Sequence, residues 1–182
     1  MKKTAMLFAN GLEEVEALTV VDLLRRAGIG CDVVALDDAA TVTGSHGIVI
    51  GTDKAFSLTD FDAYDALLLP GGMPGTRYLA EDERVLALLR KFFAAGKLTA
   101  AICAAPTVLA KAGLLAGKRA VCYPGMEDEL TGAIAGTEPV AVDGTVITSR
   151  GVGTAIPFAL ALVTYLDSAE RADALARSIV YR

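Results

Sequence analysis

Short, continuous apolar runs alternate along this chain with amphipathic stretches, and this alternation restricts the possible folds more than any other feature. The predicted strands are Thr4–Ala9, Cys31–Leu36, Ala66–Leu69, Leu98–Cys103 and Arg119–Cys122. The predicted helices are Glu13–Ala27, Glu81–Ala95, Ala104–Ala112, Thr154–Leu166 and Ala169–Ile179. Because strands without polar residues must be covered on both faces, the pattern predicts an α/β fold, a doubly wound sandwich whose mostly parallel sheet carries helices on both faces.

Two further segments are predicted to lie at the margins of this sheet. Ile48–Gly51 is predicted to be a short edge or hairpin strand. Pro139–Val142 and Thr145–Thr148 flank an Asp143-Gly144 pair, which is typical of a hairpin turn. We find no internal repeat, linker or low-complexity segment, so residues 1–182 are interpreted as one domain.

The hydrophobic fraction of 53% raises the question of a membrane protein. The longest apolar stretches, Leu98–Ala110 and Gly153–Leu166, each contain a proline and are shorter than the roughly 20 residues that span a bilayer. Lys2 and Lys3 precede an apolar run that ends at Asn10, too short for a signal peptide. We therefore expect a cytoplasmic protein without a membrane partner.

Charge and cysteine usage exclude other classes. The formal net charge is −5 and Lys and Arg form no basic patch, so a nucleic-acid partner is not expected. Three widely spaced cysteines suit reduced thiols, and Cys31 and Cys122 are interpreted as core residues. With His46 as the single histidine, a multi-histidine zinc site cannot form, and we expect neither a metal nor another cofactor.

Cys103 lies at the predicted junction of a buried strand and a helix. Ala101 and Ala105 occupy the places that glycines fill in the G-x-S-x-G nucleophile elbow, and Pro106 suits the first turn of a helix. The helix dipole and free N–H groups would favour a thiolate, so we expect a lowered thiol pKa. The alternative is a buried cysteine that packs as a small hydrophobic residue.

Two glycines follow another predicted strand. Gly71 and Gly72 allow positive φ angles and a close approach of main chain to a ligand. The N–H groups of Gly72 and Ala104 could together form an oxyanion hole beside the thiol. A Gly-Gly pair is also common in ordinary loops, and this alternative stays open.

Glu16 lies on the apolar face of the first predicted helix. A carboxylate in this position needs a partner or takes up a proton, unless its place near the helix end exposes it to solvent. Glu13 and Glu14 are expected to be solvated in the first turn. The apolar residues that share the face of Glu16 are Val20, Leu23, Leu24 and Ala27.

Two loops offer weaker candidates. Ser149–Thr154, which contains Arg150 and Gly151, could bind an anion through its backbone or could be a plain connecting turn. His46 lies in a polar loop, where an exposed side chain is the simpler interpretation.

Taken together, these segments resemble the DJ-one/ThiJ/PfpI superfamily, in its DJ-one branch, over essentially the whole chain. The resemblance implies a flavodoxin-like sandwich of the class I glutamine amidotransferase-like type and a homodimer. It also implies a reactive thiol at Cys103, a buried Glu16 hydrogen-bonded to it, and oxyanion donors at Gly72 and Ala104. The matching segments are Gly11–Glu16, Val21–Gly28, Leu69–Gly72, Ala100–Ala104, and Thr148–Gly151 with Gly153–Thr154.

The chain departs from this family at three positions. Tyr123 stands where many relatives carry a histidine near the thiol, and Ala104 follows the thiol where protease-like members carry one. His46 falls where close relatives have an arginine beside the pocket. With Arg150 and Gly151, His46 and Tyr123 are therefore possible pocket residues, and Glu16 is the only evident proton carrier.

The family's activities lead to one main hypothesis and two rivals. The main hypothesis is a cysteine-dependent enzyme that acts on small 2-oxoaldehydes: a glutathione-independent glyoxalase III-like lyase that converts methylglyoxal to lactate, or a deglycase-like hydrolase. The first rival is an oxidative-stress sensor or chaperone that acts through oxidation of Cys103 without turnover. A cysteine protease or amidase ranks last, because no histidine is placed to act as its base.

Overall fold

Seven strands form the main sheet of the computed structural model, which describes residues 1–181. All neighbouring strands run parallel except β10, which pairs antiparallel with β11 at one edge. The predicted, mostly parallel sheet and its terminal hairpin are therefore confirmed. Across the sheet the order is β10 (Val140–Asp143), β11 (Val146–Ser149), β7 (Leu98–Ile102), β6 (Ala66–Leu69), β1 (Lys3–Phe8), β2 (Gly30–Ala35) and β5 (Lys54–Ala55).

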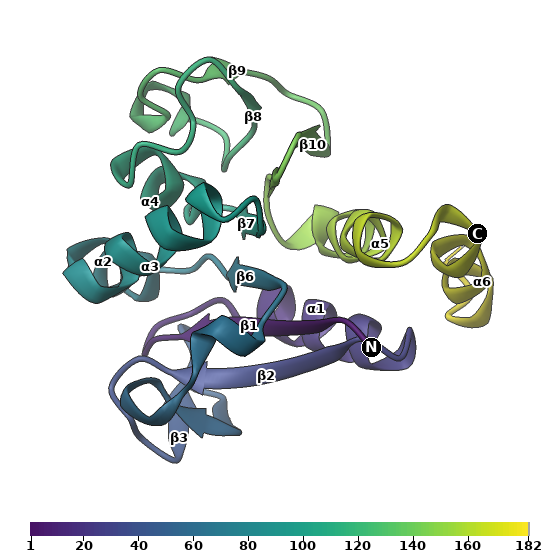
Figure 1. Ribbon diagram of the computed structural model, residues 1–182, viewed down its shortest axis with the longest axis horizontal. Helices are drawn as coiled ribbons and strands as arrows, with labels where there is room; N and C mark the ends of the chain where they lie inside the picture. The colour runs from purple at the N-terminus through teal and green to yellow at the C-terminus, as the bar shows by residue number, and fades with distance from the viewer. Residues whose placement is uncertain (182) are drawn as a thin grey trace.

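Helices cover both faces of this sheet. One face packs against α1 (Glu14–Arg26), α5 (Ala155–Leu166) and α6 (Ala169–Ser178). The other face packs against α2 (Gly75–Glu81), α3 (Glu83–Ala94) and α4 (Pro106–Lys111). In Figure 1 the second group lies to the left of the strands and α5 and α6 lie to the right. The fold is thus the doubly wound sandwich that the sequence pattern predicts.

The buried strands supply apolar side chains to both layers. In β1, Met6 and Phe8 join the cluster under α1 and α5, whereas Ala5 and Leu7 join the cluster under α3 and α4. All four side chains are fully buried. This period of two explains why the strands read as continuous apolar runs instead of alternating ones.

The apolar character of α5 is explained by its position in this core. It has 12 residues and contacts α1, α6 and β11. Within residues 1–181, no helix is long and apolar enough to cross a bilayer. The high hydrophobic fraction of the chain accordingly reflects two buried layers beside one sheet.

Three predicted elements differ from the structure. The helix predicted over Glu81–Ala95 is interrupted at Asp82, whose extended backbone ends α2 and whose carboxylate accepts from Arg84 N at 2.8 Å to cap α3. The strand predicted over Arg119–Cys122 is reduced to β8 (Arg119–Ala120), which pairs with β9 (Ile134–Ala135) outside the main sheet. Cys103 lies in the turn after β7 and not in the strand.

Several short elements complete the described part of the chain. The strand predicted near Ile48–Gly51 is β4 (Val49–Gly51), and its antiparallel partner is β3 (Thr41–Thr43). The sequence pattern missed β3, β5, β9 and α2, each seven residues or shorter. The 3-10 helices are Phe56–Leu58, Phe61–Ala63, Glu127–Glu129 and Val152–Thr154.

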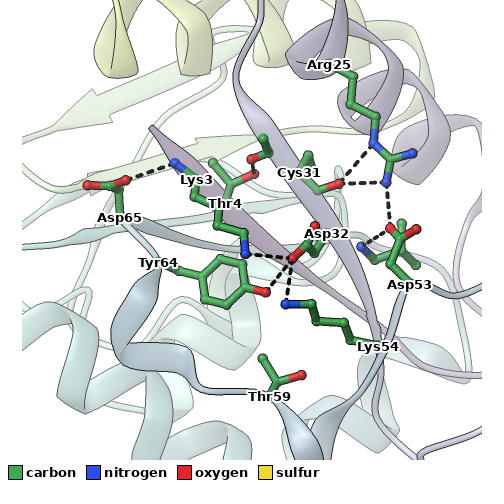
Figure 2. A network of polar contacts seen from close by, with 12 residues as sticks. Lys3, Thr4, Arg25, Cys31, Asp32, Asp53, Lys54, Thr59, Tyr64 and Asp65 are labelled. Atoms are coloured by element: carbon green, nitrogen blue, oxygen red, sulfur yellow. Dashed lines mark hydrogen bonds and ion pairs between the residues drawn. The ribbon is translucent and has the colours of Figure 1, made fainter. Parts of the chain in front are cut away.

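A polar network links the short edge strand β5 to β1 and β2 (Figure 2). Asp32 accepts from the Tyr64 hydroxyl at 2.6 Å and pairs with Lys3 and Lys54 at 3.2 and 3.1 Å. The Lys3 ammonium also lies 4.6 Å from the centre of the Tyr64 ring. Burial acts to raise the pKa of Asp32, but these partners lower it overall. Lys3 begins β1 and Tyr64 precedes β6, so this part of the network lies near the amino ends of these strands, whereas Cys103 follows the carboxyl end of β7.

Candidate active site

Cys103 occupies a strained turn after β7. Its φ angle is +66°, in the left-handed region that residues other than glycine seldom adopt. Its N–H donates to Ser149 O at 3.0 Å, and its carbonyl accepts from Tyr123 N at 2.7 Å. Because α4 begins only at Pro106, the thiol lies before the helix and not on its first residue. Hydrogen bonds to the end of β11 and from the loop that contains Tyr123 therefore hold this turn against its own strain.

The N–H groups of Gly72 and Ala104 lie beside the thiol, and both act to lower its pKa. Gly72 has a φ angle of +90°, and a Cβ there would lie within 3 Å of the backbone of Leu12 and Glu13. Glycine is thus required at this position for both its conformation and its clearance. The two donors predicted from separate loops meet at one sulfur.

Glu16 is completely buried and faces Cys103. Its Oε2 accepts from Gly71 N at 3.0 Å, and Oε1 has no partner of standard hydrogen-bond geometry. The neighbouring thiol acts to lower the pKa of this carboxyl. A Cβ on Gly71 would lie within 3 Å of both Cys103 Cβ and Glu16 Oε2, so only glycine lets the two side chains meet there. The solvent-exposed alternative for Glu16 is wrong.

Burial raises the pKa of both the thiol and the carboxyl. Burial raises the pKa of Glu16 to about 7, with the charge of Glu13 adding to the effect. Burial and the neighbouring Glu16 carboxylate raise the pKa of Cys103 to about 12, against the opposing N–H groups. The lowered thiol pKa expected from the sequence is therefore wrong, because that expectation counted the helix end and omitted a carboxylate beside the sulfur. When Glu16 is ionised, the proton stays on sulfur.

This raised carboxyl pKa predicts a loss of stability between pH 5 and pH 8. The folded protein binds one more proton than the unfolded chain between the ordinary pKa of 4.5 and about 7, so stability falls as the pH rises through that window. The difference corresponds to about 3 kcal/mol. Urea denaturation at both pH values should show this loss in the wild type and not in Glu16→Gln. The exposed Glu83→Gln is the control, and equal pH dependence in all three proteins would contradict the prediction.

Tyr123 and Gly151 lie beside the carboxyl. A Cβ on Gly151 would lie 3.6 Å from Tyr123 Cδ2 and 3.9 Å from Glu16 Oε1. The Thr154 hydroxyl accepts from the N–H groups of Arg150 and Gly151 at 3.2 and 3.1 Å. The loop's N–H groups are thus used internally, which favours a connecting turn over an anion site. The Arg150 guanidinium donates to Thr137 O at 3.0 Å.

His46 pairs with a helix residue next to the site. Its side chain is exposed, as expected, but Nδ1 lies 2.9 Å from Glu14 Oε2 and its N–H donates to Glu14 Oε1 at 2.7 Å. The hydrogen bond with Glu14 raises the pKa of His46. Burial acts to raise the pKa of Glu14, yet its hydrogen bonds with His46 and nearby backbone lower it to about 2.

The expectation that Glu13 and Glu14 are solvated is wrong, because the loop carrying His46 covers both. Glu13 instead caps α1, and its Oε2 accepts from Glu16 N at 2.8 Å. Within residues 1–181, Glu13, Glu14 and His46 form the one group whose ligand atoms could hold a metal ion, all within 4.8 Å of one another. His46 already neutralises Glu14 without an ion. Nothing in the sequence around Glu13 and Glu14 predicts that His46 pairs with Glu14.

A cysteine in a strained turn at the carboxyl end of an interior parallel strand, on a doubly wound sheet, defines a class of α/β proteins that present a nucleophile elbow. Residues 2–165 match the model of the DJ-1/PfpI family, and the chain belongs to that family.

Three relatives are similar to this chain over most of their own length. Protein dj-1beta of Drosophila melanogaster is 39% identical over 99% of this chain and 98% of that protein, and its crystal structure matches with a TM-score of 0.94. The structure of Toxoplasma gondii DJ-1 in an oxidized form is 37% identical, with a TM-score of 0.95 over 99% of this chain and 98% of that one. Deglycase PH1704 of Pyrococcus horikoshii is 34% identical over 81% of this chain and 89% of its own length.

Proposed function

We propose that this protein is a cysteine-dependent enzyme that acts on small 2-oxoaldehydes and converts methylglyoxal to lactate without glutathione. The observation that carries the proposal is the buried contact between Glu16 and Cys103, in which a nucleophile and a proton carrier of pKa about 7 meet. Family membership and a deglycase-named relative support chemistry of this general kind. A deglycase activity on glycated proteins would use the same two groups.

In the first half of the reaction the sulfur becomes bonded to the aldehyde carbon. Because ionised Glu16 is the acceptor beside the thiol, it takes the S–H proton as the S–C bond forms. The aldehyde oxygen gains negative charge, and the N–H groups of Gly72 and Ala104 are close enough to stabilise it. Glu16 then gives this proton to the negatively charged oxygen, so the product of this half is a neutral hemithioacetal and the carboxylate is restored.

In the second half a hydrogen moves between adjacent carbons. Glu16 removes the proton from the former aldehyde carbon and returns it to the neighbouring carbon through an enediol, which leaves a thioester on Cys103. Water then cleaves the S–C bond, releases the 2-hydroxy acid and restores the thiol. A carboxyl with a pKa near the working pH can both accept and return a proton, which suits this step.

The assay is lactate formation from methylglyoxal by the purified protein in buffer without glutathione. We expect many equivalents of lactate for each protein chain. Consumption of at most one equivalent of aldehyde would contradict the enzyme proposal.

The second candidate function is a sensor that acts through oxidation of Cys103. The observation in its favour is that the structure of the similar Toxoplasma protein is of an oxidized form. Protonated Glu16 could donate a hydrogen bond to a sulfinate. Absence of turnover together with a gain of two oxygens at Cys103 alone, measured by mass after mild peroxide, would favour this function.

We further propose a homodimer and a cytoplasmic location. Val15 and Leu18 on α1 and Ile48 and Val49 on the adjacent β3–β4 hairpin are exposed apolar residues. The hairpin is tied to the start of α1 by the hydrogen bond from Ser45 N to Leu12 O at 2.8 Å. Such side chains on neighbouring elements are suited to a contact between two copies.

A further inference from the structure

Tyr123 presents an aromatic surface beside the reacting pair. Its side chain is 52% exposed, although its main-chain N–H is fixed to Cys103 O at 2.7 Å. The backbone of Tyr123 is therefore fixed next to the thiol turn, while about half of the residue remains in solvent. An exposed ring held in this way can gain contact area when a ligand packs on it.

Gly151 leaves space between this ring and the Glu16 carboxyl. The point where a Cβ would stand lies within 4 Å of two ring carbons of Tyr123 and of Glu16 Oε1. The φ angle of Gly151 is 163°, which is extended backbone that any residue adopts. Glycine is thus not needed for conformation here, and its effect is to leave room where a side chain would separate the ring from the carboxyl.

The charges around this space do not favour an anionic substrate. The Glu16 carboxyl borders it, and the charge of Glu13 acts on Glu16. His46 is paired with Glu14, and Arg150 is bound to Thr137 O and lies 3.9 Å from a Glu127 oxygen. A carboxylate on the substrate would therefore meet negative charge, while both cations predicted for the pocket have other partners.

We infer that the site selects uncharged 2-oxoaldehydes with an aromatic or bulky apolar substituent, which packs on the exposed part of the Tyr123 ring, next to Gly151. This inference rests on the proposed function, because it takes an aldehyde as the substrate. The apolar surface of the Tyr123 ring can itself be tested without turnover. An apolar group that fills such a space typically changes rates by about 10-fold to 200-fold.

The first experiment measures the second-order rate of Cys103 alkylation by iodoacetamide and by N-phenyl iodoacetamide, followed by intact mass. We expect the phenyl reagent to react at least about 10-fold faster with the wild type and with Tyr123→Phe. Tyr123→Ala keeps the main-chain bond to Cys103 but loses the ring, so its preference should fall to near one. The same ratio in all three proteins, or no preference in the wild type, would overturn the inference.

The second experiment compares kcat/KM for methylglyoxal, phenylglyoxal and glyoxylate, with lactate and mandelate as the products of the first two. We expect phenylglyoxal to be preferred, glyoxylate to be rejected, and the phenyl preference to fall about 10-fold in Tyr123→Ala. A ring-dependent alkylation ratio without any aldehyde turnover would support the surface and contradict the proposed function. Turnover of methylglyoxal with no dependence on Tyr123 would support the function and overturn the inference.

Discussion

Cys103→Ala is expected to lower lactate formation from methylglyoxal to the uncatalysed rate. The sulfur is the atom that bonds to the aldehyde, whereas Glu16 transfers protons and the two N–H groups stabilise charge in the proposed mechanism. The loss should appear in kcat, because a step is removed and not a binding contact. Lactate assays over an enzyme concentration series measure the effect.

The matched control is Cys122→Ala. That thiol is buried in the other apolar cluster, under α3 and α4, and its pKa is raised chiefly by burial. Its replacement should leave most of the activity intact, while circular dichroism verifies that both variants keep the fold. Residual turnover in Cys103→Ala, or equal losses of activity in the two variants, would contradict a mechanism that depends on Cys103.

Glu16→Gln is expected to lower kcat/KM by about 100-fold or more, the usual contribution of a general acid–base group. In the wild type the ionised carboxylate must accept the thiol proton, so activity should rise with pH and reach half its maximum near pH 7. The amide cannot accept that proton, and the rise centred near pH 7 should disappear.

The measurement is a pH–rate profile from pH 5.5 to 9 for the wild type, Glu16→Gln and Glu83→Gln. Glu83 is exposed in the first turn of α3, so its variant should keep the wild-type profile. A Glu16→Gln protein that retains a midpoint near pH 7 would show that a different group carries the proton.

The sheet could be predicted because its strands are buried on both faces. Ala66–Leu69 forms β6 with the predicted bounds, and all four residues are buried. The interruption at Asp82 was missed because the apolar period continues across it from Leu79 to Val85, and only the capping geometry separates the helices. β5 was missed because two residues carry no period.

The candidate site was predictable where local sequence determines geometry. The small residues around Cys103 predict a tight turn, and the apolar neighbours of Glu16 predict a buried carboxyl. The direction of the thiol pKa was not predictable in this way, because it depends on how closely α1 approaches the turn after β7. The burial of Glu14 likewise depends on a distant hairpin.

Main chain, and not side chains, forms the wall around the sulfur on the side of Gly71 and Gly72. A methyl group at Gly72 would collide with the backbone of residues 11–13, just before α1, and one at Gly71 would collide with the reacting pair itself, so that wall cannot be reshaped by substitution. In variants selected for activity on new aldehydes, the substitutions should accordingly accumulate at Tyr123 and Gly151. The side of the site formed by Gly71 and Gly72 thus tolerates no substitution, whereas the side formed by Tyr123 and Gly151 does. We expect the aldehyde preference to be changed through the second side alone.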